Sequence, residues 1–205
     1  MTESPLAAMI IHDLAGYLTS VHGFLEIVQA RPDHPARDDL LSSAVSESGT
    51  ALQALKDLQF VRSVDAGDLL EQVTEVPLQE VLDPVRERLS EEHGVTLAPA
   101  APGLVSVNAD RDLFADVLGR CIAAALATNA EAAHDVKTTV ASDTVRIDID
   151  FGPSTDLNDV EEGARTGRKV MRPLALAQLL LTRWGGYLQT EVSERSRISL
   201  FLRRV

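Results

Sequence analysis

Apolar side chains recur at helical spacing through the first 60 residues. Ser4 and Pro5 are typical of a helix N-cap and first turn, and a first stripe follows them. Its members are Leu6, Ile10, Leu14, Tyr17, Val21, Phe24 and Val28. The turn-forming sequence RPDHPARDD separates this stripe from a second one. The second stripe contains Leu41, Ala44, Ser48, Ala51, Leu52, Leu55 and Leu58. The pattern predicts a helical hairpin whose first helix runs from about 5 to 30.

The hairpin alone is too thin to enclose a core. Two helices with one wide apolar stripe each leave apolar surface exposed, whereas two hairpins from two chains can form a four-helix bundle. We therefore expect a homodimer. The sequence VDAGD at 64–68 is typical of a hinge. It predicts a boundary between a dimerisation hairpin, residues 1–66, and a second domain, residues 67–205.

Shorter elements of mixed type follow the hinge. Alternation in TVRIDIDF predicts a strand, and Ser142-Asp143 predicts the turn before it. Helices and a mostly antiparallel sheet together predict an α+β layer sandwich. The expected strands lie near 72–76, 95–98, 104–108, 136–141 and 144–151, with a closing hairpin over 187–204. The expected helices lie near 78–92, which contains Pro84, and over 111–130 and 172–184.

Composition excludes several classes of function. The net charge of −12 opposes binding to nucleic acid phosphates and to anionic lipid. Cys121 is the single cysteine, so the chain has neither an internal disulfide framework nor a cysteine pair for zinc. No apolar run reaches the roughly 18 to 20 residues of a membrane span. We expect a cytoplasmic protein that binds no nucleic acid, no membrane and no metal ion.

His12 lies in the first predicted helix, on the side away from its apolar stripe. At about 100° per residue it falls nearly opposite the centre of the apolar stripe, so we expect it to be exposed. Gly16, Thr19 and Gly23 continue its line and are small. Each helical glycine costs roughly 0.8–1 kcal/mol relative to alanine, which favours a use for close approach. We expect a partner to bind at Gly16, Tyr17, Thr19 and Gly23.

Asp13 is the candidate partner of the imidazole. When a carboxylate holds one N–H of a histidine, the other nitrogen presents a lone pair that can accept a phosphoryl group. Neighbours at i and i+1 do not share a helix face, so the two side chains must lean together. An ordinary exposed His-Asp pair is the alternative. The paired hairpins and the small-residue line favour a reactive site, with His12 and Asp13 as its catalytic residues.

The stretch HDLAGYLT resembles the H-box of bacterial two-component histidine kinases. In that family the histidine is the phosphorylated residue and lies on a dimeric helical hairpin. His12, Asp13, Leu14 and Leu18 match the pattern, whereas residues 15–17 depart from it. The resemblance implies that His12 is a phosphoacceptor.

DLFADVLGRCIAAAL is similar to the N-box helix of the kinase ATP-binding domain, and DIDFGPS is similar to its first glycine box. The alignment places Arg120 and Ala124 where the family has two asparagines, and alanine cannot coordinate Mg²⁺. Asp150, which would bind the adenine amino group, and Gly152 are kept. Ser154 replaces the next glycine.

The later phosphate-binding glycine run is replaced by MRPLALA, residues 171–177. A phosphate loop needs exposed backbone N–H groups, and Pro173 has none. The resemblance therefore implies weak or absent triphosphate binding and no bound cofactor. The segment 156–172, which stands in place of the ATP lid, is either a loop or a partner contact.

A phosphoacceptor without a working nucleotide site resembles the ChpT-type histidine phosphotransferases. LKDLQFVRSVDAGD, residues 55–68, is similar to the end of their second helix, and residues 172–202 are similar to their closing helix and hairpin. The implied fold is α+β: a helical hairpin that forms a dimeric four-helix bundle, followed by a degenerate histidine-kinase-type ATPase α/β sandwich.

The implied function is phosphotransfer without autokinase activity in a two-component phosphorelay. His12 would accept a phosphoryl group from a receiver-domain aspartate and pass it to a second receiver, with Mg²⁺ supplied by the receiver. The implied partners are response-regulator receiver domains and, upstream, a hybrid or sensor histidine kinase. Two alternatives stay open. One is an atypical histidine kinase with residual ATP binding through Asp150, and the other is a non-catalytic dimeric scaffold that binds receivers or kinases.

Overall fold

The computed structural model of the 205-residue chain describes residues 4–69, 71–93, 105–128, 135–151, 171–192 and 196–205. The chain divides into two compact units, Met1–Leu69 and Leu70–Val205. The strand expected near 95–98 and nearly all of the segment 156–172 lie outside the described residues. None of the described helices is both long enough and apolar enough to pass through a lipid bilayer.

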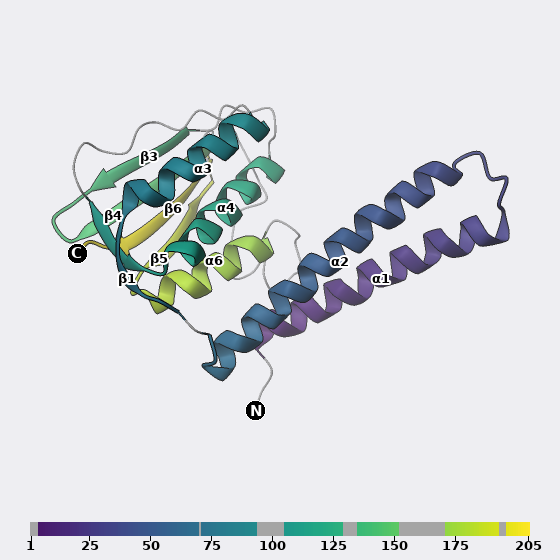
Figure 1. Cartoon of the computed structure of the whole chain (residues 1–205), viewed down its shortest axis with the longest axis horizontal. Helices are drawn as coiled ribbons and strands as arrows, with labels where there is room; N and C mark the ends of the chain where they lie inside the picture. Colours follow the sequence, from purple (N-terminus) through teal and green to yellow (C-terminus); the bar gives the residue numbers. More distant parts are fainter. Residues whose placement is uncertain (1–3, 70, 94–104, 129–134, 152–170, 193–195) are drawn as a thin grey trace. The chain divides into compact units, whose positions relative to one another are not determined.

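The first unit is a helical hairpin, as predicted (Figure 1). It consists of α1, Pro5–Ala30, and α2, Arg37–Ala66. The first turn of α1 begins at Ser4, whose carbonyl accepts a hydrogen bond from the Ala8 N–H. In the connecting turn, the Ala36 N–H donates to Nδ1 of His34 over 3.1 Å. The helix α2 ends at Gly67, whose φ of 74° is the left-handed conformation that favours glycine.

The hairpin has a narrow interior of mostly aliphatic side chains. Four of the buried residues come from α1: Ala7, Met9, Ile10 and Tyr17. The apolar ones on α2 are Ala44, Ala51, Ala54, Leu58, Val61 and Val64. Several alanines among them let the two helices approach closely. The interior uses only part of the apolar stripe expected on α2, because Leu52 and Leu55 stay exposed.

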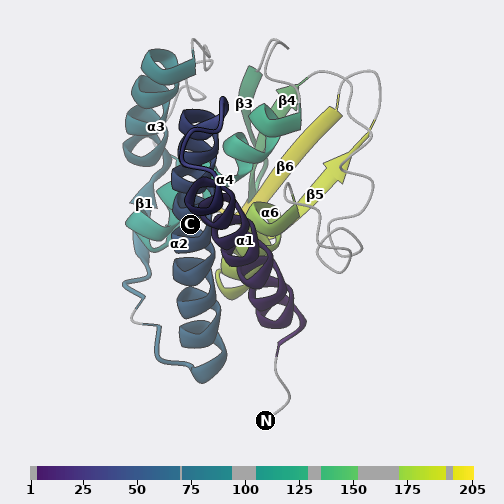
Figure 2. The ribbon, with the colours of Figure 1, turned by 90° about the vertical axis from the view of Figure 1, so that its right-hand side faces the viewer.

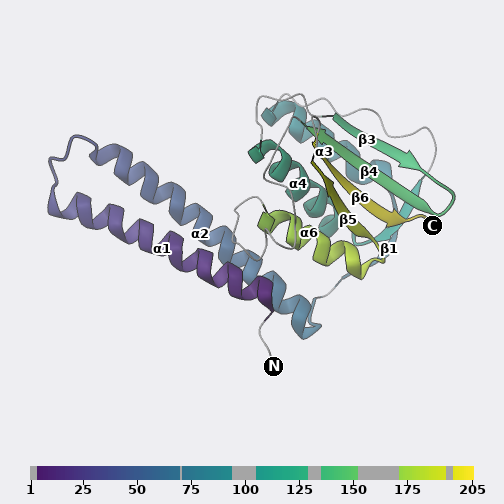
Figure 3. The same cartoon turned by 180° about the vertical axis from the view of Figure 1, so that it is seen from behind.

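The second unit is an α+β sandwich, as predicted. Its main sheet is antiparallel and has the order β3-β4-β6-β5. These strands are β3 Asp135–Val140, β4 Thr144–Phe151, β5 Tyr187–Glu191 and β6 Ser196–Arg203. A smaller sheet pairs β1, Thr74–Pro77, with β2, Ser106–Ala109. The helices of this unit are α3 Leu78–His93, α4 Arg111–Thr128 and α6 Met171–Arg183. Figures 2 and 3 show these helices on one side of the main sheet.

The two faces of β4 have different chemistry. Val145, Ile147, Ile149 and Phe151 alternate along the strand and are buried, on the face that packs against the helices. Arg146, Asp148 and Asp150 point to the other face. On that face the register sets Asp150 opposite Arg197 and Asp148 opposite Ser199 of β6. The strand therefore separates an apolar core from a layer of paired charges.

The helix α6 ends in a tight turn before β5. Trp184 is 7% exposed, and Gly185 follows it with a φ of 72°. A Cβ at Gly186 would come within 2.3 Å of the carbonyl oxygen of Phe201. Glycine is required at this position because the backbones of the turn and of β6 almost touch.

Candidate functional site

The side chain of His12 projects from α1 into solvent and is 89% exposed. Its Nδ1 lies 3.7 Å from Oδ1 of Asp13, whose side chain is only 13% exposed. The distance is too long for a direct hydrogen bond between the two side chains. The arrangement leaves Nε2 as the ring nitrogen that faces away from Asp13.

The line of small residues lies open beside His12. Gly16 and Thr19 are exposed and Gly23 is half-buried. A Cβ added to Gly16 or Gly23 would meet no atom within 4 Å, so the packing of this hairpin does not require glycine at either position. The hydroxyl of Thr19 donates to the Ala15 carbonyl of its own helix over 2.8 Å. If close approach selects these small residues, the approaching group comes from another molecule.

Tyr17 does not belong to this open surface, which corrects the expectation that it contacts the partner. Its residue exposure is 7%, and it lies among the buried residues of the hairpin. The reason is helical geometry: at about 100° per residue, Tyr17 lies about 140° around the helix from His12. Its ring supports the hairpin and offers little contact area to another molecule.

The hairpin carries a second apolar surface, which we call the outer seam and of which sequence reasoning named only Leu52 and Leu55, as part of the second stripe. It consists of large apolar side chains that remain exposed: Ile11, Leu18 and Leu25 on α1, and Val45, Leu52 and Leu55 on α2. Leu18 is 54% exposed and Leu52 is 61% exposed. The seven-residue spacing of the three α1 positions was the available signal, because such spacing is typical of helices that pack along a seam.

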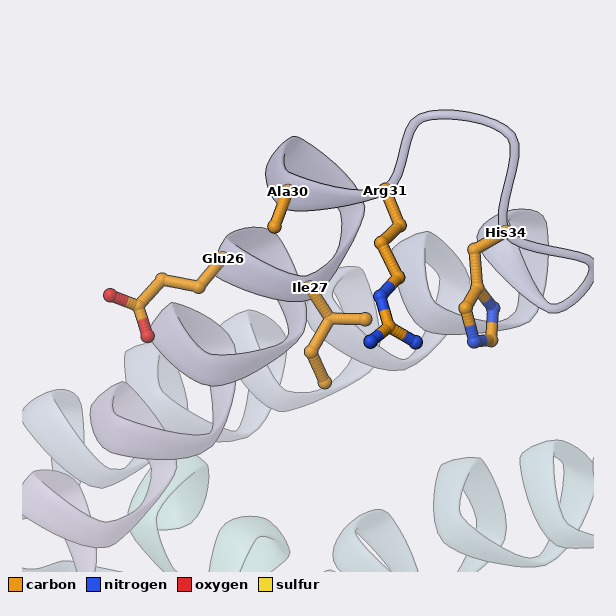
Figure 4. A pocket seen from close by; sticks show the side chains of 5 residues that line it. All are labelled: Glu26, Ile27, Ala30, Arg31 and His34. Carbon is orange, nitrogen blue, oxygen red and sulfur yellow. The ribbon is translucent and has the colours of Figure 1, made fainter.

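The turn of the hairpin carries a separate hollow of about 500 Å³ (Figure 4). Glu26, Ile27, Ala30, Arg31 and His34 line it. Figure 4 shows the side chains of Arg31 and His34 extending to the same side, whereas Glu26 points away. Ile27 follows His12 by 15 residues, which is about 22 Å along a helix at 1.5 Å per residue. The hollow is therefore not part of the His12 site.

The positions aligned with the kinase asparagines carry no ligand for a cation. Nε of Arg120 lies 2.6 Å from Oδ2 of Asp116, one turn earlier on α4. Ala124 is 1% exposed and lies in the core of the second unit. A methyl group there offers no oxygen to Mg²⁺. Among the described residues, no three His, Cys, Asp or Glu side chains come together closely enough to hold a metal ion.

The carboxylate of Asp150 is already engaged. Its Oδ1 accepts a hydrogen bond from Nε of Arg197 over 2.5 Å, and its Oδ2 lies 3.5 Å from Nζ of Lys137. Burial by itself raises the pKa of Asp150, but the hydrogen bond and charge of Arg197, with a contribution from Lys137, outweigh burial and lower it. The carboxylate is therefore held ionised by two cations on the face of the sheet away from the helices.

This geometry corrects the expectation that Asp150 is kept for an adenine. The residue at the end of β4 that faces the helices is Phe151, which is 1% exposed. Asp150 matches the motif in residue type, but its side chain lies on the face of the strand away from the helices. Gly152 and Ser154 lie outside the described residues. The sequence MRPLALA forms the first turns of α6, where Leu174, Leu176 and Ala177 are fully buried.

Solved histidine kinases have the same fold. The Acinetobacter baumannii histidine kinase AdeS matches with a TM-score of 0.75 at 17% identity, over 94% of this chain and 97% of that chain. The histidine kinase ThkA, solved in complex with the response regulator protein TrrA, matches with a TM-score of 0.73 at 15% identity. Full-length ShkA in complex with AMPPNP matches with a TM-score of 0.58 at 15% identity.

The matches cover 97% of this chain and 60% of the ThkA chain, and 95% of this chain and 44% of the ShkA chain. The chain thus spans less than two thirds of either protein. No protein-family model matches the sequence, and a search of curated proteins finds no significant similarity. At these identities the likeness shows the fold. The chain has a histidine-kinase-type fold, a helical hairpin followed by a domain of the ATP-binding type.

Proposed function

We propose that this protein is a histidine phosphotransferase of a two-component phosphorelay. His12 accepts a phosphoryl group from the aspartate of one receiver domain and passes it to a second receiver. One observation carries the proposal: a histidine with an 89% exposed side chain stands on a kinase-type hairpin, while the corresponding nucleotide positions hold a buried methyl group and an engaged carboxylate. The histidine is presented for reaction, and the means of charging it from ATP are missing at these positions.

The transfer uses the ring nitrogen that faces away from Asp13. The lone pair of Nε2 attacks the phosphorus of the receiver's aspartyl phosphate, the P–O bond to the aspartate breaks, and the carboxylate leaves with the electron pair. The nearby charge of Asp13 favours the ring with its proton on Nδ1 and stabilises the positive charge that develops there. The second transfer reverses these steps on another receiver. Mg²⁺ comes from the receiver in both.

The outer seam supports a homodimer. Exposed leucines, isoleucine and valine along both helices form an apolar surface too extended for a hairpin that stays alone in water. A second copy would bury this seam in a four-helix bundle. Ile11 of the seam lies about 100° around α1 from His12, so dimerisation leaves the histidine accessible. The receiver then docks along Gly16, Thr19 and Gly23.

The relay is tested with two receiver domains and substoichiometric amounts of this protein. We expect it to speed phosphoryl transfer from the phosphorylated receiver to the second one, and His12→Gln to abolish this. His22→Gln is the matched control, because His22 is also exposed on α1 and lies 3.2 Å from a carboxylate, that of Glu26. Equal loss in both variants, or no loss in the His12 variant, contradicts the proposal. The second result supports a scaffold that carries no phosphate.

An atypical histidine kinase is the second candidate, and the fold favours it because the same fold occurs in ShkA bound to AMPPNP. It requires magnesium-dependent ATP binding by the second unit. Titration calorimetry measures this directly. Saturable binding at sub-millimolar ATP supports the kinase, whereas no heat above dilution supports the phosphotransferase.

A further inference from the structure

The chain enters the second unit through two residues that are bonded to separate helices. The side chain of Glu71 is only 9% exposed. One of its oxygens, Oε1, forms an ion pair with Nε of Arg183, in the last turn of α6. The other, Oε2, accepts a hydrogen bond from the indole N–H of Trp184 over 3.1 Å. One carboxylate thus ties the linker to the end of α6.

The next residue ties the linker to the start of α4. The backbone N–H of Gln72 donates to Oδ2 of Asp110 over 2.8 Å. Oδ1 of the same aspartate accepts from the N–H groups of Asp112 and Leu113, both over 3.1 Å, and so caps α4. The capping residue of the helix is therefore also the acceptor that holds the linker.

Trp184 joins the two attachments. Its ring meets Phe114 of α4 edge to face, with centroids 6.0 Å apart and an interplanar angle of 79°. The indole is buried on its apolar side and directs its N–H toward Glu71. Arg183 and Gln72 are exposed, so the attachments lie at the surface of the unit and their opening exposes mainly the indole of Trp184.

On the hairpin side, hydrogen bonds hold the chain as far as Leu69. The N–H groups of Asp68 and Leu69 both donate to the Ser63 carbonyl at the end of α2, over 2.9 and 3.2 Å. A single residue separates Leu69 from Glu71. Beyond Gln72, the next element of regular secondary structure is β1, which begins at Thr74.

We propose that Glu71, Gln72, Asp110, Arg183 and Trp184 form a releasable clasp that sets the length of the tether between the two units. With the clasp closed, two residue steps join Leu69 to Glu71 and span at most about 7 Å, at about 3.5 Å per residue. Release frees the chain as far as Thr74, about 17 Å on the same basis. The clasp is a conformational device of the linker and does not depend on phosphotransfer by His12.

The sole tryptophan of the chain reports on the clasp. In the full-length protein, Glu71→Ala removes the ion pair with Arg183 and the hydrogen bond from Trp184, and leaves Gln72 held by a single bond from its backbone N–H to Asp110. We expect a red shift of tryptophan emission, stronger quenching by acrylamide, and exchange of the amide hydrogens of residues 71–73 at least tenfold faster. Arg183→Gln keeps the indole bond, so we expect a smaller change. Glu75→Ala is the matched control, because Glu75 is an exposed glutamate on neighbouring β1.

The tether is measured by ¹⁵N relaxation of the same variants. We expect Glu71→Ala to shorten the rotational correlation time of the second unit relative to that of the hairpin, while amides of α4 and β4 keep their protection from exchange. Unchanged quenching and unchanged exchange at residues 71–73 overturn the clasp. Faster exchange with unchanged relative tumbling overturns its control of the tether. Loss of protection throughout the second unit also overturns the proposal, because it makes Glu71 a general structural residue.

Discussion

At the scale of single residues, the direction of a side chain decides its role more than its type does. Asp13 and Asp150 are both carboxylates beside motif positions of a kinase-type chain. Asp13 lies 3.7 Å from an exposed imidazole, whereas Asp150 is enclosed by Arg197 and Lys137 on the outer face of a sheet. The first lies beside the histidine that we propose as the phosphoacceptor. The second contributes to folding.

The lowered pKa of Asp150 makes a prediction about acid stability. Because its folded-state pKa lies below the ordinary value of 3.8, the ionised pair stabilises the fold above that value, and this contribution is lost as the pH falls through the folded-state pKa. We expect Asp150→Asn to be less stable than the native chain at pH 7. The difference should shrink below about pH 4, where an unperturbed aspartate is already protonated. Denaturant unfolding over this pH range measures it, and a difference independent of pH contradicts the assignment.

A second prediction at this scale concerns the motif itself. Ala124→Asn restores the asparagine of the kinase alignment, but the position is 1% exposed and apolar. We expect a loss of about 1–3 kcal/mol in unfolding free energy, the usual cost of an unsatisfied buried polar group, and no gain of magnesium-dependent ATP binding. Denaturant unfolding of the variant tests the loss of stability, and titration calorimetry tests the absence of ATP binding. A stable variant that binds ATP would show that only one side chain separates this chain from a kinase.

At the scale of elements, α1 presents three faces with separate uses. One face packs on α2, the face with Ile11, Leu18 and Leu25 forms the outer seam, and the face with His12 is open. Helical periodicity predicted the hairpin, and Ser4-Pro5 marked the start of its first helix, which the structure has as Pro5–Ala30. It merged the buried stripe with the seam, because periodicity shows which positions are apolar but not which neighbour covers them.

The seam predicts the effect of a charge on dimerisation. Leu52→Glu places one carboxylate from each copy in the interface, so we expect at least a tenfold weaker dimer. The matched control is Ser46→Glu, an exposed position on α2 away from the seam. Light scattering across micromolar concentrations measures the change. A native chain that stays monomeric at high concentration, or a Leu52 variant as dimeric as the native chain, contradicts the use of the seam.

Strand pattern allowed a similar but incomplete prediction in the second unit. Alternation located β4 and its turn, and Gly185-Gly186 marked the end of α6. The role given to Asp150 was wrong because the alignment followed the order of letters, although Val145, Ile147, Ile149 and Phe151 already defined the inner face. Counting by two from Ile149 would have identified Phe151 as the residue facing the helices.

At the scale of the whole molecule, the two units differ in what they present. The hairpin carries the exposed histidine, and the second unit keeps the kinase-type fold with its nucleotide positions filled or engaged. Fold class was predictable because it depends on many positions at once. The burial of Tyr17 was also predictable, because Tyr17 belongs to the apolar stripe of the first helix. The clasp at Glu71 was not, since it depends on contacts between residues far apart in sequence that no local pattern records.

The proposed function predicts which unit the receiver docks on. In the proposed transfer, the receiver contacts the hairpin and not the second unit. Substitutions confined to the second unit, such as Lys137→Ala, should therefore leave the rate of phosphoryl transfer to His12 within about twofold. Gly16→Leu adds bulk to the docking line of the hairpin and should slow the same transfer by tenfold or more, because a clash of about 1.4 kcal/mol is a factor of ten. Quenched time courses with one phosphorylated receiver measure the transfer rate of each variant. A slower transfer in Lys137→Ala than in Gly16→Leu would place the docking surface on the second unit.

The most direct measurement is the appearance of labelled phosphate on the full-length chain. The protein is incubated in parallel with a ³²P-labelled phosphorylated receiver and with magnesium and labelled ATP, and the product is tested for acid-labile, base-stable label and mapped by mass spectrometry. We predict label on His12 from the receiver alone, and none in His12→Gln. Label acquired from ATP without a receiver, label on another residue, or no label from any receiver that binds the hairpin would contradict the account.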